Sequence, residues 1–340
     1  MTCQHSAAFA ASALLLACSV DTPLEGKRCP CIDGYICNPA TNTCVERTGA
    51  MPAPSTLLGV ADFQAAWATP NQVFWTWTSD GAKEDFARYE VWIATSEGDL
   101  LAGKVTRIGP EVNPELGRYT LPRTGAAEDF VRATLTDGLA PDTPYVAQLV
   151  AVDRVGSAAL SDVALITTSL EPVVDVPLFA DAAPAWTVPD CVQTTAQMSF
   201  SGSSHLQYTV QCSDDGCSPG GPTCWSAPSI AYDADFSGLG PGTFGDAFLE
   251  FAMAIDATSH IYWGALVLSG PGGAFSTEPV TYRADGKYRV YQIALRALHD
   301  ANRQLTHADL STAGELTGFA MGGVLPQGSV QRLDGVRVRW

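Results

Sequence analysis

The amino-acid sequence predicts an all-β chain in which a small cysteine-rich module is followed by two β-sandwiches. Two observations support this expectation. Aromatic and β-branched residues alternate with polar residues in many short runs, and loops rich in Gly, Pro and Ser separate these runs. A period of two is typical of half-buried strands, and many short strands joined by such loops are typical of sandwiches and jelly rolls. With 340 residues, the chain is long enough for two or three domains.

The N-terminus begins with a short apolar run at residues 7–17 that ends directly before Cys18. The run is too short to span a bilayer and is typical of a secretory signal. Leu15-Leu16-Ala17-Cys18 resembles the lipobox of bacterial lipoproteins, which are cut before a cysteine that then carries acyl chains. The resemblance implies a signal at residues 1–17, lipidation of Cys18 and an exported chain, with Ser19 favouring the outer membrane. The first five residues carry no Lys or Arg, however, and a buried apolar helix is the alternative.

The net charge limits which partners are compatible with the chain. Lys and Arg number 19 against 36 Asp and Glu, which gives a formal charge of −17. An acidic surface repels phosphate backbones, so we expect no nucleic-acid binding. There is also no basic cluster of the kind that binds a membrane surface. No run of 18 apolar residues follows residue 17, so the expected membrane contact is the lipid anchor alone.

The ten cysteines support export. Cys3 lies in the expected signal and Cys18 at the expected lipidation site. The remaining eight fall into two clusters of four: Cys29, Cys31, Cys37, Cys44, and Cys191, Cys212, Cys217, Cys224. Even-numbered clusters in an exported chain predict two disulfides in each, with the connectivity open. Zinc is the alternative reading, but neither cluster has C-x₂-C spacing or a suitably placed histidine.

The N-terminal part divides by composition into a module and a linker. Residues 18–48 are rich in turn residues and nearly free of large apolar ones, so disulfides would have to replace a core. This stretch resembles the small knotted module that follows the lipidated cysteine in exported myxobacterial-type proteins, and we interpret it as a stalk. Residues 49–56, which contain Pro52 and Pro54, predict a linker.

Residues 57–169 carry alternating strand patterns and one specific motif. Leu139-Ala140-Pro141-Asp142-Thr143-Pro144-Tyr145 is followed by apolar residues at every second position. This resembles the fibronectin type III domain. The resemblance implies that Tyr145 is a tyrosine corner bound to backbone near Leu139, and that Trp77 is a core tryptophan. The connection between residues 96 and 130 is longer than is usual in that family.

A second linker is predicted at residues 170–178, and residues 179–340 predict a β-sandwich or jelly roll. The last strand should place Val336, Val338 and Trp340 on one side and arginines on the other. Three segments resemble carbohydrate-binding jelly rolls of bacterial polysaccharide-degrading systems: 285–290, 305–310 and 333–336. The resemblance implies a domain that binds polysaccharide.

Motifs for catalysis or cofactors are weak. Gly240-Pro241-Gly242-Thr243-Phe244-Gly245 matches G-x-G-x-x-G, but no acidic residue follows about 20 positions later. We therefore expect a glycine-rich loop before a strand and no cofactor. The sequence has no G-x-S-x-G or H-E-x-x-H, and the histidines after the signal lack metal-ligand spacing. We predict no catalytic residue and no metal-binding residue, and we expect the chain not to be an enzyme.

Glu250 is the one carboxylate that invites a catalytic interpretation. On a strand, Phe248, Glu250, Ala252 and Ala254 share a face, and a buried carboxylate there has the raised pKa of a glycosidase acid. We favour the alternative that this face is the solvent or groove side of the sandwich and that Glu250 is hydrated.

We expect a cell-surface, lipid-anchored modular binding protein whose C-terminal domain recognises polysaccharide through aromatic rings. The candidate ligand-binding residues are Trp225, Tyr232, Tyr262 and Trp263, with Tyr291 as a further aromatic. The alternatives are a structural or protein-binding envelope lipoprotein with no small ligand, or a glycoside-active enzyme. Asp233, Asp235 and Asp334 could hold a structural calcium, but an acidic turn explains them more simply.

Overall fold

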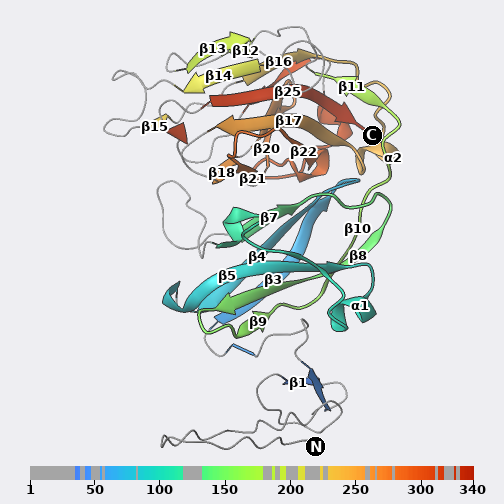
Figure 1. Ribbon diagram of the computed structural model, residues 1–340. Coiled ribbons are helices and arrows are strands. Elements are labelled where there is room, and N and C mark those ends of the chain that lie inside the picture. The colour runs from blue at the N-terminus through green and yellow to red at the C-terminus, as the bar shows by residue number, and fades with distance from the viewer. Residues whose placement is uncertain are drawn as a thin grey trace, which may run out of the picture. The chain divides into compact units, whose positions relative to one another are not determined.

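The structure is a computed structural model of the chain. It describes residues 35–38, 43–46, 54–55, 58–81, 83–117, 132–178, 186–187, 192–196, 206–210, 223–224, 229–256, 261–264, 266–277, 280–310, 313–317, 325–326 and 330–340. The chain forms two compact units, Met1–Met51 and Pro52–Trp340. The described residues are mainly strands (Figure 1), which confirms the prediction of an all-β fold.

The described residues of the first unit form an antiparallel hairpin, β1 (Tyr35–Asn38) and β2 (Thr43–Glu46). The register places Cys37 opposite Cys44. Of the other expected disulfide cysteines, only the backbone of Cys224 in β15 (Thr223–Cys224) is described. The expected disulfides, the signal and Cys18 lie outside what the structure describes and stay predictions.

The first sandwich consists of two antiparallel sheets in the second unit. The smaller sheet has the order β3-β4-β7, with β3 (Leu58–Ala68), β4 (Val73–Gly81) and β7 (Arg132–Thr136). The larger has the order β10-β8-β5-β6, with β9 also on β8: β5 (Phe86–Ala94), β6 (Thr106–Ile108), β8 (Pro144–Asp153), β9 (Ala158–Leu160) and β10 (Ala164–Thr167). Helix α1 (Glu97–Leu101) and 3₁₀ turns at Lys83–Asp85 and Pro114–Gly117 occupy the connections.

The core of this sandwich confirms the specific expectations for residues 57–169. Trp75 and Trp77 of β4 are buried between the sheets with Tyr89 and Leu149. The backbone N–H of Ala140 donates a hydrogen bond to the Tyr145 hydroxyl over 2.9 Å. This is the tyrosine corner implied by the fibronectin type III resemblance, because the hydroxyl is tied to backbone a few residues upstream.

The second sandwich contains two larger sheets. One, here called the arginine sheet, has the order β13-β14-β25-β17-β22, with β11 also on β25: β11 (Asp175–Pro177), β13 (Val192–Ala196), β14 (Leu206–Val210), β17 (Phe248–Asp256), β22 (Arg289–Ala294) and β25 (Val330–Arg339). The other has the order β12-β16-β23-β19-β20: β12 (Trp186–Thr187), β16 (Ser229–Asp233), β19 (Val267–Gly270), β20 (Gly273–Ser276) and β23 (Ala313–Thr317).

The remaining elements of the second sandwich are short. Strand β15 pairs with β24 (Leu325–Pro326), and β18 (Ile261–Gly264) pairs with β21 (Val280–Arg283). Helix α2 is Pro241–Phe244, and 3₁₀ turns lie at Leu295–Ala297 and His307–Asp309.

Two expectations about the ends of this sandwich have definite outcomes. Val336, Val338 and Trp340 are buried in its core, as the alternation in the last strand predicts. Residues 170–178, by contrast, are not all linker, because Asp175–Pro177 forms β11 and pairs with Arg337–Arg339 of β25. The prolines suggested a linker, but Pro177 lacks only one backbone donor and is tolerated at the end of a short strand.

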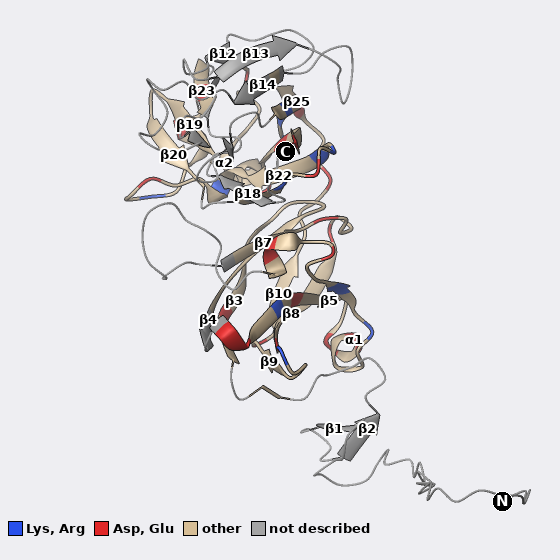
Figure 2. Ribbon diagram, turned by 60° about the vertical axis from the view of Figure 1, so that its left-hand side comes forward, with Lys and Arg blue, Asp and Glu red and all other residues tan. Residues whose placement is uncertain are grey.

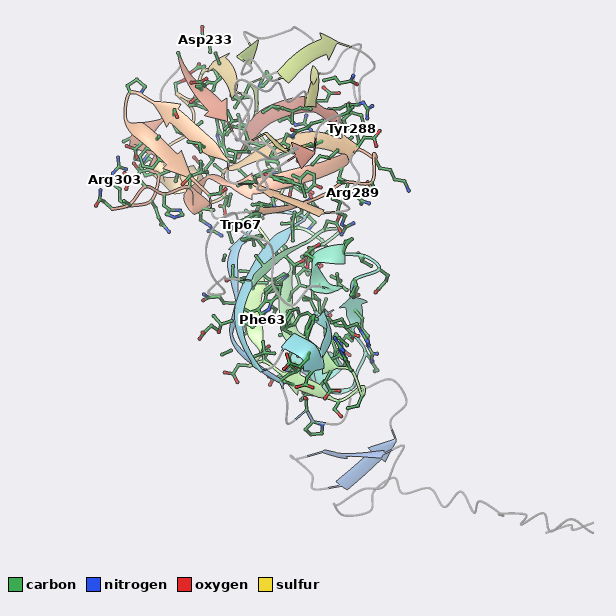
Figure 3. All side chains as sticks on the ribbon, turned by 90° about the vertical axis from the view of Figure 1, so that its left-hand side faces the viewer. Phe63, Trp67, Asp233, Tyr288, Arg289 and Arg303 are labelled. Carbon is green, nitrogen blue, oxygen red and sulfur yellow. The ribbon has the colours of Figure 1, made fainter. Side chains whose placement is uncertain are left out.

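The two sandwiches share a continuous apolar core within the second unit. Trp67, Phe74 and Leu135, on the β3-β4-β7 sheet, belong to the same buried cluster as the core of the second sandwich. Trp67 stacks on Phe74 with ring centroids 5.1 Å apart. Figure 3 labels Trp67 where the two sandwiches meet and Phe63 inside the first. Both faces of the β3-β4-β7 sheet are therefore covered, one by its own sandwich and the other by the second.

Candidate functional site

A bulge in β25 gathers arginines on the outer face of the arginine sheet. Glu250 pairs with Arg337 while Ala252 pairs with Asp334, so β25 has one residue more than β17 at this point. Gly335 has φ = 59°, a left-handed conformation that favours glycine. The extra residue shifts the alternation by one, and Asp334 and Arg337 therefore point to the same side although they are three positions apart.

Glu250 is the centre of a buried ion-pair network on this face. Arg337 donates to Glu250 Oε1 from Nη2 over 2.6 Å, and Arg339 donates to Oε2 from Nη1 over 3.1 Å. Arg337 also pairs with Asp175 of β11 at 3.1 Å. Figure 2 shows basic and acidic segments side by side near the C-terminal end. The expected hydrated glutamate is thus wrong, because Glu250 is 5% exposed and both of its oxygens accept hydrogen bonds.

The pKa of Glu250 is shifted in the direction opposite to that of a catalytic acid. Burial alone would raise it, but the hydrogen bonds from Gln292 and Arg337 and the charges of Arg339 and Arg337 outweigh burial and lower the pKa. A glycosidase acid needs a raised pKa so that it carries a proton near neutral pH. The arrangement therefore suits a structural carboxylate.

A second group of polar side chains lies further along the same face, and we call it the tyrosine cluster: Tyr288, Arg332, Asp334 and Gln207. Arg332 Nε donates to Gln207 Oε1 over 2.9 Å. Burial and the nearby charge of Asp334 raise the pKa of Tyr288 to about 12, against a smaller lowering by Arg332. The phenol is therefore a neutral hydrogen-bond donor. Figure 3 labels Tyr288 on the second sandwich.

Small residues lie in the same rows as the tyrosine cluster. Ala252 and Ala254 of β17 pair with Asp334 and Arg332 of β25. Ala252 and Ala254 are buried, so the longer side chains in the neighbouring rows cover this part of β17. An aromatic ring, a guanidinium, a carboxylate and an amide are thus brought together, and these groups suit the faces and hydroxyls of sugars.

Tyr232 and Tyr291 were expected to face a ligand, and the structure places both in the core. Burial raises the pKa of Tyr232 to about 12. Its ring packs so closely on β23 that a Cβ at Gly314 would lie 2.6 Å from the Ser269 carbonyl oxygen and closer to the Tyr232 hydroxyl. Strand alternation alone does not reveal which face is internal, and here the aromatic face is the internal one.

The side chains of the other expected ligand residues lie outside the described part of the chain. Trp225 lies outside the described residues, and only the backbone of Tyr262 and Trp263 is described, in β18. The tyrosine cluster was missed because none of its members stands in a distinctive motif. The available signal was the alternation in β25, which predicts that Arg332 and Asp334 share a face if Leu333 points inward.

The sequence predicts no metal-binding residue and no cofactor. In the part of the chain that the structure describes, no three or more His, Cys, Asp or Glu side chains lie close enough together to hold a metal ion. Asp235 accepts a hydrogen bond from the backbone of Ser237 in an acidic turn. The G-x-G-x-x-G segment was expected to be a loop, but its residues Pro241–Phe244 form the single-turn helix α2. The expected strand follows it as β17. No described helix has the length and apolar character to span a bilayer.

A small cavity lies where the two sandwiches meet, lined by residues that include Gln72, Glu115 and Arg283. Its volume is about 20 Å³, which is room for roughly one water molecule. A sugar does not fit there. If the second sandwich binds a glycan through its described residues, the better candidate is the outer face of the arginine sheet near the partly exposed Tyr288 and Arg332.

Comparisons with known proteins give weak structural likenesses. No protein-family model matches the chain, and no curated protein matches it significantly. A family 11 carbohydrate-binding module of a cellulosomal cellulase from Clostridium thermocellum is 9% identical, with TM-score 0.30, over 49% of this chain and 92% of that one. A tandem of family 22 carbohydrate-binding modules from Paenibacillus barcinonensis is 10% identical, with TM-score 0.28, over 85% and 93%. A two-domain fibronectin type III segment of chicken tenascin is 10% identical, with TM-score 0.22, over 73% and 94%.

Proposed function

We propose that this chain is an exported, lipid-anchored surface protein whose C-terminal sandwich binds polysaccharide. The observation that supports this best is the tyrosine cluster on the outer face of the arginine sheet. Its four side chains come from two strands, β14 and β25, and from the residue preceding β22, and they offer both donors and acceptors. The TM-scores of the structural neighbours are too low to add to this argument.

Each member of the cluster has a distinct expected role. Tyr288 supplies an aromatic face, while its hydroxyl oxygen is buried and stays protonated because the pKa is raised to about 12. Arg332 supplies donors that Gln207 holds in place. Asp334 is 2% exposed and lies beneath the surface, where its charge helps to keep the Tyr288 hydroxyl protonated. Recognition through neutral hydroxyls is compatible with an acidic protein, since no anionic ligand has to approach it.

We propose a binding role in preference to a catalytic one. The strongest catalytic candidate, Glu250, has a lowered pKa and is held by two arginines. It thus lacks the proton that a glycosidase acid must deliver. Assay of the purified chain on the polysaccharides that retain it tests this directly: release of reducing ends that Glu250→Gln abolishes would make the chain an enzyme.

The binding proposal predicts retardation of the purified chain in gels that contain its polysaccharide. Arg332→Ala is expected to weaken binding about tenfold, equivalent to ~1.4 kcal/mol. Arg303→Ala is the matched control, because Arg303 is a partly exposed arginine of the same sandwich that pairs with Asp309 instead. Equal retardation of the two variants would contradict the assignment of the site. An absence of retardation by any polysaccharide would favour a protein-binding envelope lipoprotein.

The lipid anchor is a separate part of the proposal and rests on the sequence at Cys18. We expect a mature protein that begins at Cys18 and carries acyl chains, each buried CH₂ adding about 0.8 kcal/mol to membrane attachment. Cys18→Ser is expected to release the protein from the membrane fraction, whereas Cys3→Ser, within the signal, is expected to have no effect. A mature protein that retains Met1 would contradict the anchor.

A further inference from the structure

The arginine sheet has a free edge at β22. Among the described residues, this strand is the last in its sheet and pairs with β17 on one side only. The backbone groups on the other side of an edge strand are unpaired and form a template for another strand. Folded proteins normally cover or disrupt such edges. The backbone N–H and C=O groups of β22 that face away from β17 therefore need hydrogen-bond partners from another element.

The side chain of Gln72, from the turn between β3 and β4, forms hydrogen bonds with these groups. Its amide Nε2 donates to the carbonyl of Val290 over 2.7 Å, and its Oε1 accepts from the backbone N–H of Gln292 over 2.8 Å. A residue of a parallel neighbouring strand makes the same two contacts, accepting from one residue and donating to the residue two positions away. The carboxamide of Gln72 thus takes the place of a strand backbone.

The contact is reciprocal, because Gln292 reaches back to the same turn. Its Oε1 accepts from the Thr69 hydroxyl over 2.8 Å, and its Nε2 donates to Glu250 over 2.7 Å. Gln72 and Gln292 are each 4% exposed. Breaking these hydrogen bonds would cost free energy, because each buried amide would lose its partner without gaining a hydrogen bond to water.

We infer that Gln72 caps the edge of β22 in place of a further strand and thereby fixes the fibronectin-like sandwich to the second sandwich. The first sandwich is then no flexible spacer. It is a structural part of its neighbour, and it protects β22 from pairing with β22 of a second copy. This inference requires no ligand and is independent of the proposed polysaccharide binding.

Hydrogen exchange of the intact chain tests the inference without any substitution. The amide of Gln292 points away from β17, so without Gln72 it would exchange as an unpaired edge amide. We expect it to exchange as slowly as the amides that bond to β17. Fast exchange in the unmodified protein would overturn the inference.

Substitution provides the second arm of the test. Gln72→Met keeps the side-chain length but removes both hydrogen bonds, and we expect Gln292 to exchange on the order of tenfold faster. Gln148→Met is the matched control, because the Gln148 amide donates to Ser161 within the first sandwich. We expect a concentration-dependent dimer, seen by sedimentation, only for Gln72→Met. Unchanged exchange at Gln292 in that variant would contradict the capping role.

Discussion

Replacing Trp67 by Ala is expected to lower the free energy of unfolding by about 3–5 kcal/mol and to separate the unfolding of the two sandwiches. Trp67 is 4% exposed and lies in the core cluster of the second sandwich, although its strand belongs to the first. Its loss would leave a cavity in the shared core next to Phe74. Denaturant titration followed by hydrogen exchange measures both effects, since each sandwich then reports separately.

Phe63→Ala is the control for this prediction. Phe63 lies on the same strand, but it stacks on Trp75 inside the first sandwich with centroids 5.0 Å apart. We expect a similar loss of stability without separation of the two sandwiches, because the shared core stays intact. A single cooperative transition in Trp67→Ala, at the wild-type midpoint, would refute the shared core.

Replacing Glu250 by Gln is expected to lower the free energy of unfolding by about 3 kcal/mol. Removing one partner of a buried ion pair leaves the other charge without compensation, which costs about 3–5 kcal/mol. The lower end applies here because the side chain of Arg337 is 41% exposed and water screens part of its charge. Asp175→Asn is the control: this carboxylate shares Arg337 but is 43% exposed, so we expect a loss below about 1 kcal/mol.

The same residue predicts a dependence of stability on pH. The pKa of Glu250 in the folded chain lies below its ordinary value of 4.5, so the unfolded chain binds a proton first as the pH falls. The stabilisation by Glu250 is therefore complete above about pH 5 and is lost as the pH falls through the lowered pKa. Glu250→Gln should lack this part of the acid dependence. Parallel stability curves for the two proteins below pH 5 would contradict the ion-pair assignment.

Local patterns predicted those parts of the fold that local physics determines. The Leu139–Tyr145 motif predicted a tyrosine corner, because its hydrogen bond spans only five residues. Alternation in the last five residues, 336–340, predicted which side of this end of β25 is buried. Apolar residues stand at every second position from Ile261 to Val267, yet β18 and β19 lie in different sheets. Periodicity reports the exposure of a face but not the identity of the neighbouring strand.

The environment of Glu250 could not be predicted because it depends on residues far away in the sequence. Its partners Gln292, Arg337 and Arg339 are 42, 87 and 89 positions away. Arg337 reaches the glutamate only because the bulge at Gly335 shifts the alternation of β25. No count of apolar residues around position 250 contains this information. Tyr232 was misassigned for a related reason, since its burial depends on β23 and on the absence of a side chain at Gly314.

Amide chemical-shift mapping of the whole chain, with an oligosaccharide of the polysaccharide that retains it, tests the central claim most directly. The tyrosine cluster predicts the largest shifts at Tyr288, at Arg332 and Asp334 of β25, and at Ala252 and Ala254 of β17, with little change in the first sandwich. Saturating shifts confined to another surface, such as the exposed edge strand β10, would contradict it.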